Sequence, residues 1–195
     1  MQAIAQALGV QCEYCHSAER GSGQPEPRKD IARQMMAMTR EINARVQAAT
    51  SKGPTEAATV ECATCHRGVA IPRPLLSILR ETLVRLGPAA AGDQYKELRS
   101  RYYGGQAYDF SESALINLAQ PLASGKPDDA IAVLKLNLDY FPKSAKTYAA
   151  IAYAYTRKYD DATAITMLEK ALEFEPDNGL VQGQLAQLKM YQRRK

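Results

Sequence analysis

The sequence predicts an all-α protein, on two observations. Apolar residues recur at helical spacing over long stretches, as in the series Ile31, Met35, Met38, Ile42 and Val46. In the C-terminal half, two similar segments are offset by 34 residues, a period typical of proteins built from stacked pairs of helices. Segments rich in Gly and Pro separate the apolar stretches and are expected to end the helices.

The N-terminal part is expected to contain two helices. Residues 1–9 predict a short helix that stops at Gly9. Residues 30–50 predict a longer amphipathic helix with Asp30 as the candidate N-cap. Two segments are expected to be a loop and a helix break, namely GSGQPEPR (21–28) and SKGPTEA (51–57).

A further helix is expected around residues 75–86, followed by a connector that ends near residue 112. Beyond it, AIAVLKLNLDYFPKS and AITMLEKALEFEPDN align at the offset of 34, which pairs Ala130 with Ala164, Leu134 with Leu168, Leu138 with Leu172 and Pro142 with Pro176. The first copy is weaker at its start, where Asn117 and Pro121 occupy apolar and aromatic positions.

This period resembles the tetratricopeptide repeat, whose unit is two antiparallel helices. The second copy fits that pattern at Tyr148, Ile151, Ala152, Tyr155, Ala164, Leu168, Ala171 and Pro176. About three units are normally needed for stability, and residues 113–195 supply fewer. We therefore expect this section to be stabilised by packing against the connector. The inner face, including Tyr153 and Arg157, is then expected to be free for a protein partner, and packing between helices is the other interpretation of Tyr153. The alternative is an ordinary helical bundle.

All four cysteines and both histidines fall in two copies of C-x-x-C-H, within QCEYCHS and ECATCHRG. This spacing is that of a covalent haem c attachment site. Two thiols on one helical turn can both add to the haem vinyl groups. The pairs are Cys12 with Cys15 and Cys62 with Cys65, and the next residues, His16 and His66, would be the proximal iron ligands.

Other uses of paired cysteines fit less well. A zinc site usually separates its two C-x-x-C pairs by about 15–20 residues, and the separation here is much larger. A thioredoxin-type redox pair needs neither the histidine nor a second copy. Zinc and disulfides remain the alternatives to two haems.

The sixth iron ligand has to come from elsewhere. The chain has no third histidine, so bis-histidine ligation within the chain is excluded. Methionine is the remaining candidate, and the chain has six. A methionine-filled site gives an electron carrier of raised potential, whereas an open site would bind small ligands or peroxide.

MQAIAQALGVQCEYCH, together with IARQMMAMTREIN and VECATCHRGVAIP, resembles the haem-binding segments of the cytochrome c subunit of photosynthetic reaction centres. The resemblance covers roughly residues 1–74. It implies a helix before each motif that supplies a methionine as sixth ligand. By position, Met1 would serve the haem of His16 and Met35 that of His66. Met38 shares a face with Met35 and is expected to pack on the porphyrin, and Met36 points elsewhere.

Two departures limit what the resemblance carries over. The reaction-centre subunit has four haems and lacks the repeat section, so photosynthesis is not implied. Arg67 and Arg73 flank the second motif. Each could pair with a haem propionate or raise the haem potential through its charge, and each is equally well explained as an ordinary solvated arginine.

Charge and hydropathy exclude other classes. The net charge is +4, and the basic residues form no stripe of the kind that binds nucleic acid. No apolar run approaches the length of a membrane span. Haem c is attached outside the cytoplasm, so we expect a periplasmic or extracellular protein. An export signal is expected upstream of Met1, and a lipid anchor to the membrane could lie there as well.

The sequence thus predicts a dihaem cytochrome c domain over residues 1–80, a helical connector over 81–112 and a repeat section over 113–195. The expected function is electron transfer between redox partner proteins through two covalently attached haem c groups, without enzymatic activity. Two alternatives remain. One is a subunit of a polymeric cytochrome, as a homo-oligomer or filament, and the other is a dihaem peroxidase, which would need an open iron and distal acid–base groups.

Overall fold

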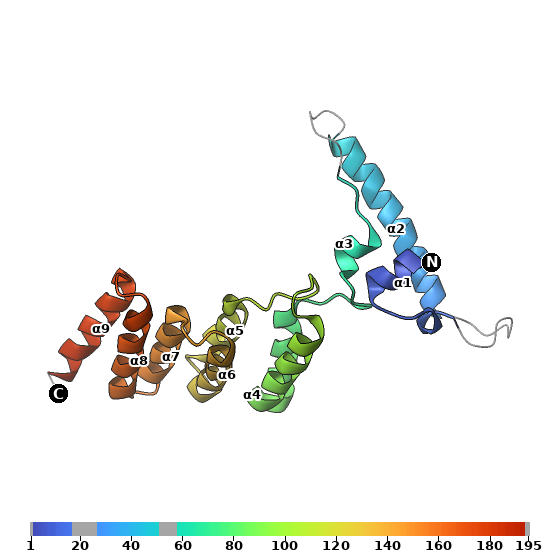
Figure 1. Ribbon diagram of the computed structural model, residues 1–195. Coiled ribbons are helices and arrows are strands. Elements are labelled where there is room, and N and C mark those ends of the chain that lie inside the picture. Colours follow the sequence, from blue (N-terminus) through green and yellow to red (C-terminus); the bar gives the residue numbers. More distant parts are fainter. Residues whose placement is uncertain (1, 17–26, 51–57, 194–195) are drawn as a thin grey trace. The chain divides into compact units, whose positions relative to one another are not determined.

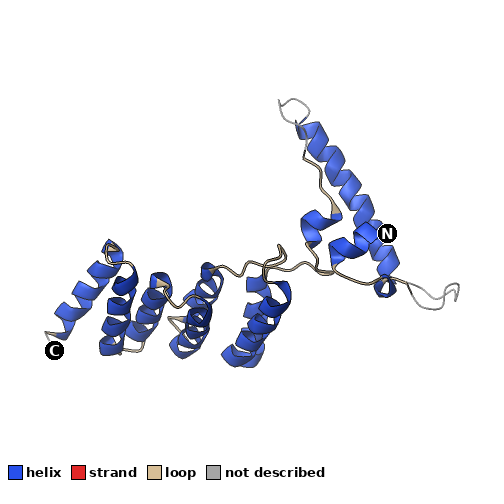
Figure 2. Ribbon diagram, viewed as in Figure 1, coloured by secondary structure: helices blue, strands red, loops and turns tan. Residues whose placement is uncertain are grey.

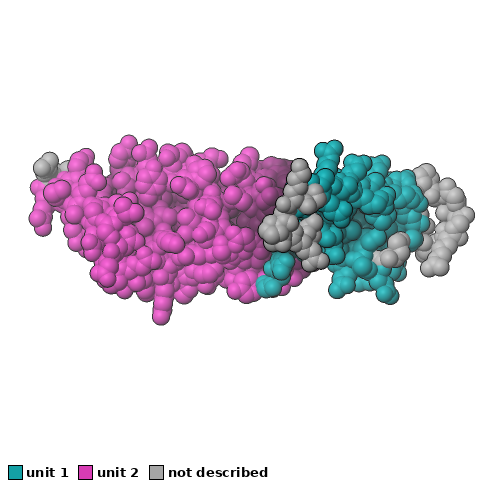
Figure 3. All heavy atoms as spheres, turned by 90° about the horizontal axis from the view of Figure 1, so that it is seen from above, with its two compact units in different colours: residues 1–72, 104–107 teal, residues 73–103, 108–195 magenta. Residues whose placement is uncertain are grey.

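A computed structural model describes residues 2–16, 27–50 and 58–193 (Figure 1). Within these ranges every regular element is a helix, which confirms the predicted all-α fold (Figure 2). The chain divides into two compact units, residues 1–72 with 104–107 and residues 73–103 with 108–195 (Figure 3). No helix in the described part of the chain is both long and apolar enough to cross a membrane.

The first unit contains α1 (Gln2–Leu8), the 3-10 helix η1 (Cys12–Tyr14), α2 (Pro27–Thr50) and α3 (Cys62–His66). The short helices α1 and α3 pack against each other. Among the described residues of this unit, Ala7 alone is a fully buried apolar side chain. So thin a core means that polypeptide packing alone supplies little hydrophobic stabilisation to this unit.

The start of α2 differs from the prediction. The helix begins at Pro27, a residue suited to the first helical position because its missing N–H would have no helical partner there. Asp30 is therefore not the N-cap. It lies in the first turn, where it pairs with Arg33. The predicted loop therefore ends before Pro27, and its residues 21–26, like the predicted break at 51–57, lie outside the described residues.

The second unit begins with α4 (Leu75–Tyr102). The sequence predicted a helix only to about residue 86, but the helix continues after a kink at Gly87. Gly87 has φ of 86° and ψ of 177°, which breaks the helical path for one residue. Pro88 then has the backbone angle of a helix start, so the next helical segment begins at once.

Five more α-helices follow, with η2 (Gln120–Leu122) between the first two, and successive helices pack in chain order (Figure 1). They are α5 (Glu112–Ala119), α6 (Pro127–Tyr140), α7 (Ala145–Arg157), α8 (Asp161–Phe174) and α9 (Gly179–Gln192). Helices α6 and α8 begin and end 34 residues apart, and so do the starts of α7 and α9. Helix α5 is short because Pro121, which has no N–H to donate, lies just beyond its end.

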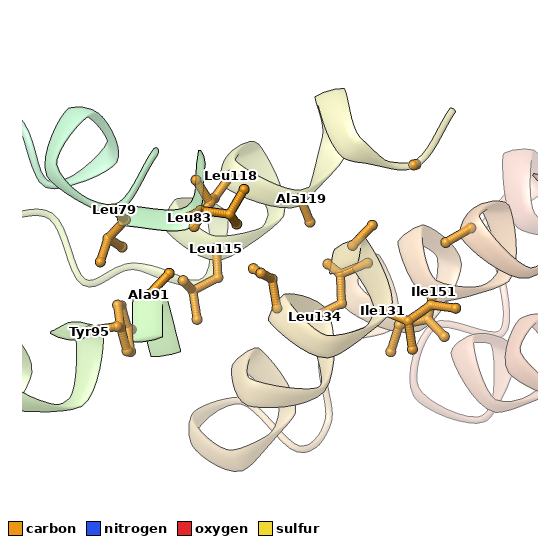
Figure 4. Packing of buried hydrophobic residues seen from close by; sticks show 14 of the residues in the cluster. Leu79, Leu83, Ala91, Tyr95, Leu115, Leu118, Ala119, Ile131, Leu134 and Ile151 are labelled. Atoms are coloured by element: carbon orange, nitrogen blue, oxygen red, sulfur yellow. The ribbon is translucent and has the colours of Figure 1, made fainter. Parts of the chain in front are cut away.

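Helix α4 shares one hydrophobic core with α5, α6 and α7 (Figure 4). Its contribution comes from Leu75, Leu79, Leu83, Ala91 and Tyr95, all buried. They pack with Leu115, Leu118, Ile131, Leu134 and Ile151, among others. Helix α4, which includes much of the predicted connector, is thus a structural part of the C-terminal section.

Aromatic side chains close one end of this core around Arg99. The ring of Tyr95 meets those of Phe110 and Tyr140 at centroid distances of 5.6 Å and 5.5 Å. The Arg99 guanidinium lies 4.0 Å from the ring centroid of Tyr103 and 4.4 Å from that of Tyr140. It also donates hydrogen bonds to the Tyr95 hydroxyl and the Phe110 carbonyl. These contacts join the end of α4 to α6.

Candidate haem-binding site

The first C-x-x-C-H motif forms a single helical turn at η1. The Cys15 and His16 amides both donate to the Cys12 carbonyl, at 3.2 Å and 3.0 Å. Cys12 is exposed, and Cys15 and His16 are half-buried. Both thiols are free and lie on one turn, as addition to two vinyl groups of one porphyrin requires.

The second motif is α3 itself, and its start is capped. The Thr64 hydroxyl accepts a hydrogen bond from the Glu61 amide at 3.0 Å, and the Glu61 side chain accepts one from the Thr64 amide. This reciprocal pair satisfies two amides that an uncapped helix start would leave open. Cys62 is half-buried and Cys65 exposed, and neither forms a disulfide.

The end of α3 orients the second histidine. Arg67 adopts the left-handed conformation with φ of 51°, and Gly68 follows with φ of 83°. This turn brings the Val69 carbonyl to 3.1 Å from Nδ1 of His66. A carbonyl can only accept, so Nδ1 carries the proton and the lone pair on Nε2 is left for a metal.

The two motifs are joined through the helix that precedes the first. The Gly68 amide donates to the Ala7 carbonyl at 2.8 Å, so the end of α1 packs on the turn after α3. Gly9 has φ of 65°, and a Cβ at this position would lie 2.1 Å from the Gly68 carbonyl oxygen. Sequence reasoning identified Gly9 only as a helix stop, but the contact with Gly68 also excludes any side chain there.

A second contact anchors the other side of α3. The side-chain amide of Asn43 on α2 donates to the Val60 carbonyl at 2.9 Å and accepts from the Val60 amide at 2.7 Å. The segment that enters the second motif is thereby attached to the methionine-bearing helix. Asn43 is the last residue of IARQMMAMTREIN, one of the segments that carry the family resemblance. Neither its spacing nor its residue type had indicated a role for it.

The candidate sixth ligands lie mostly on one exposed stripe of α2. Met35 and Met38 are 44% and 45% exposed, and Ile31 beside them is 54% exposed. Met36 is half-buried on a different face. Equal exposure does not distinguish Met35 from Met38, and Met1 lies outside the described residues.

The two arginines have partners within their own units. Arg67 donates to the carbonyls of Thr64 and Gln106, at 3.4 Å and 3.5 Å. Arg73 belongs to the second unit, where it forms an ion pair with Glu81 at 2.7 Å. The hydrogen bond from Arg73 lowers the pKa of Glu81 below its usual value.

This set of donors fits covalent haem. Two free thiols share one turn in each motif, the His66 ring has its iron-binding nitrogen available, and thioether side chains are exposed on a neighbouring helix. Among the described residues, which include all four cysteines and both histidines, no cluster of three or more His, Cys, Asp or Glu side chains could hold a metal ion.

Comparison with known proteins agrees with the chemistry. Residues 1–96 match the sequence profile of the family described as photosynthetic reaction centre cytochrome C subunit. A protein named cytochrome c-554, from Chloroflexus aurantiacus, is 35% identical over 65 residues, which are 33% of this chain and 15% of that relative. The similarity thus covers a small part of the relative's length. The section that carries both motifs is similar to c-type cytochromes, a family that binds haem covalently and transfers electrons.

Proposed function

We propose that this chain is an exported dihaem c-type cytochrome that carries electrons between redox partner proteins. One observation carries the proposal: two C-x-x-C-H turns lie in one compact unit, and the second has its histidine fixed by the Val69 carbonyl. Haem supplies the one-electron chemistry, since its iron alternates between two oxidation states. The protein's part is to attach, ligate and orient it.

Within each motif the cysteines and the histidine have different roles. Cys12 and Cys15 would hold one porphyrin, with His16 as its proximal ligand. Cys62 and Cys65 would hold the other, with His66 as ligand. The hydrogen bond from Nδ1 of His66 to a carbonyl makes the imidazole a stronger donor to iron, because it increases the basicity of Nε2.

The sixth ligands are proposed to be methionines, Met1 for the haem of His16 and Met35 for that of His66. Exposed thioethers on α2 would become buried against the porphyrin, and Met38 would pack on its face. The thin core of the first unit supports the binding of two haems, because two porphyrins would provide the apolar area that the polypeptide lacks. We infer that Arg67, next to His66, raises the haem potential through its charge, and Arg73 is the less favoured candidate because it already pairs with Glu81.

The C-terminal section is proposed to be a short set of tetratricopeptide repeats that docks a partner protein. The 34-residue offset between α6 and α8, and between the starts of α7 and α9, supports this assignment. A surface pocket of about 310 Å³ between α7, α8 and α9 is a suitable place for a partner side chain. Its lining includes Tyr153, Thr156 and Gln184, which combine aromatic area with hydrogen-bonding groups. Arg157 is exposed one turn beyond Tyr153.

We infer a periplasmic or extracellular location, because haem c is attached outside the cytoplasm. The second candidate function is a subunit of a polymeric cytochrome. It is favoured by α9, the last helix of the stack, where Leu180 and Met190 are 83% and 57% exposed and could contact another subunit.

The test is a redox titration of the holoprotein with visible spectra recorded in both states, followed by carbon monoxide addition to the reduced form. An electron carrier should titrate reversibly by two electrons per chain, show low-spin spectra and fail to bind carbon monoxide. High-spin iron that binds carbon monoxide at once would favour a peroxidase-type enzyme. Light scattering over a range of protein concentrations would separate the carrier from the polymer.

A further inference from the structure

Asn43 on α2 makes a two-point contact with the backbone of Val60. Its side-chain nitrogen donates to the Val60 carbonyl at 2.9 Å, and its oxygen accepts from the Val60 amide at 2.7 Å. Both groups of Val60 are therefore satisfied by one side chain. The contact is half-buried and joins residues that are 17 positions apart.

The chemistry of this contact specifies asparagine. A peptide unit presents one donor and one acceptor, and a short planar amide presents the complementary pair. Aspartate could accept from the Val60 amide but could not donate to its carbonyl. Leucine has nearly the same shape and makes neither bond, so it would leave two backbone groups of Val60 without protein partners.

Because of where Val60 lies in the chain, the contact affects the placement of the second motif. Val60 lies two residues before Cys62, the first residue of α3, and the segment from residue 58 to 60 has no regular structure of its own. The two hydrogen bonds of Asn43 join this segment to α2, so its side chain fixes where the second motif begins relative to that helix. On its other side, the motif is attached to α1 by the bond from Gly68 to Ala7.

We propose that Asn43 is a positioning residue for the haem of His66. The inference rests on the proposed function, in which a methionine of α2 supplies the sixth ligand. A coordination bond between iron and sulfur tolerates a deviation of only a few tenths of an ångström from its ideal length. Asn43 holds the histidine-bearing segment against the methionine-bearing helix and would thereby fix the separation between His66 and the methionine sulfur.

The test compares holoprotein variants in the ferric and ferrous states. Asn43→Leu removes both bonds, and Asn43→Asp keeps one. Thr50→Val is the matched control, because it removes an intrahelical hydrogen bond from the Thr50 hydroxyl to the Val46 carbonyl without touching Val60. Intact mass first establishes that two haems are attached, and the wild type must show the near-infrared sulfur-to-iron charge-transfer band. Failure of either requirement refutes the proposed function rather than the role of Asn43.

Asn43→Leu should lose up to half of the charge-transfer band, because one of two haems is affected. It should also bind up to one carbon monoxide per chain when reduced, well below its unfolding temperature. Asn43→Asp should lie between Asn43→Leu and the wild type, and Thr50→Val should match the wild type. The proposal is overturned if Asn43→Leu only lowers the unfolding temperature and leaves the band and carbon monoxide binding unchanged. The proposal is also overturned if both Asn43 variants attach only one haem, because Asn43 would then be needed for folding or haem attachment rather than for positioning the sixth ligand.

Discussion

The junction between Gly9 and Gly68 allows a quantitative test of how the two motifs are held together. Both glycines have positive φ, at 65° and 83°, so an alanine at either position carries the cost of the left-handed conformation, about 1–2 kcal/mol. The surroundings differ. A Cβ on Gly68 meets nothing within 4 Å, whereas a Cβ on Gly9 would lie 2.1 Å from the Gly68 carbonyl oxygen.

Gly9→Ala should therefore be more destabilising than Gly68→Ala. At 2.1 Å the backbone of α1 or of the turn after α3 has to move, at a cost of about 1–3 kcal/mol for overpacking a well-fitted site. The shift also weakens the bond from Gly68 to Ala7, worth about 1 kcal/mol net. We expect Gly9→Ala to cost about 2–4 kcal/mol more than Gly68→Ala. For a unit of this size, that difference lowers Tm by roughly 10–30 °C.

The assay is thermal unfolding of the holoprotein followed by circular dichroism in the haem absorption band, which reports on the haem-bearing unit alone. Because Gly9 precedes the first motif and Gly68 follows the second, Gly9→Ala should perturb the spectra of both haems. Equal losses of Tm for the two variants would refute the reasoning, since they share the strain and differ only in the contact.

Three further predictions follow from the proposed ligands and the second unit. Met35→Ala should open the haem of His66 to carbon monoxide and lower its potential, whereas Met38→Ala should mainly loosen packing; the reverse pattern would move the ligand to Met38. A fragment of residues 73–195 should unfold cooperatively by circular dichroism, whereas a fragment of residues 113–195 should not, because it lacks the part of the core that α4 supplies. Cooperative unfolding of a monomeric 113–195 fragment would contradict this. Burial raises the pKa of Tyr95 above its ordinary value of 10.0. The unfolded state therefore loses the Tyr95 proton first, and the free energy of unfolding should fall as pH rises past 10. In urea titrations Tyr95→Phe should flatten this fall with pH, and an unchanged slope would exclude Tyr95 as its source.

The fold was largely predictable because helical spacing and helix breakers are local signals. The two errors arose at prolines. The sequence suggested an N-cap at Asp30, but Pro27 already starts α2. It also suggested that Gly87 and Pro88 end a helix, whereas together they produce a kink within α4. A proline that follows a glycine can begin a helix as well as end one, and local sequence does not distinguish the two cases.

The candidate site was predictable only in part. The attachment motifs are contiguous in sequence, so spacing identifies their cysteines and histidines. The contacts that hold the motifs in place join Asn43 to Val60 and Ala7 to Gly68, which are distant in sequence. Hydrogen bonds of this kind depend on tertiary packing and leave no periodic signal. The functional boundaries at residues 80 and 112 stay a prediction, since the compact units divide the chain by packing and place α4 with the C-terminal section.

The most direct test of two covalent haems is intact mass under denaturing conditions, measured on protein produced with the haem-attachment machinery. The wild type should gain two haem masses. A variant with Cys12→Ser and Cys15→Ser should gain one, and so should a variant with Cys62→Ser and Cys65→Ser, because each motif holds its own haem. A wild-type gain of one haem or none, or zinc in place of iron, would contradict the account.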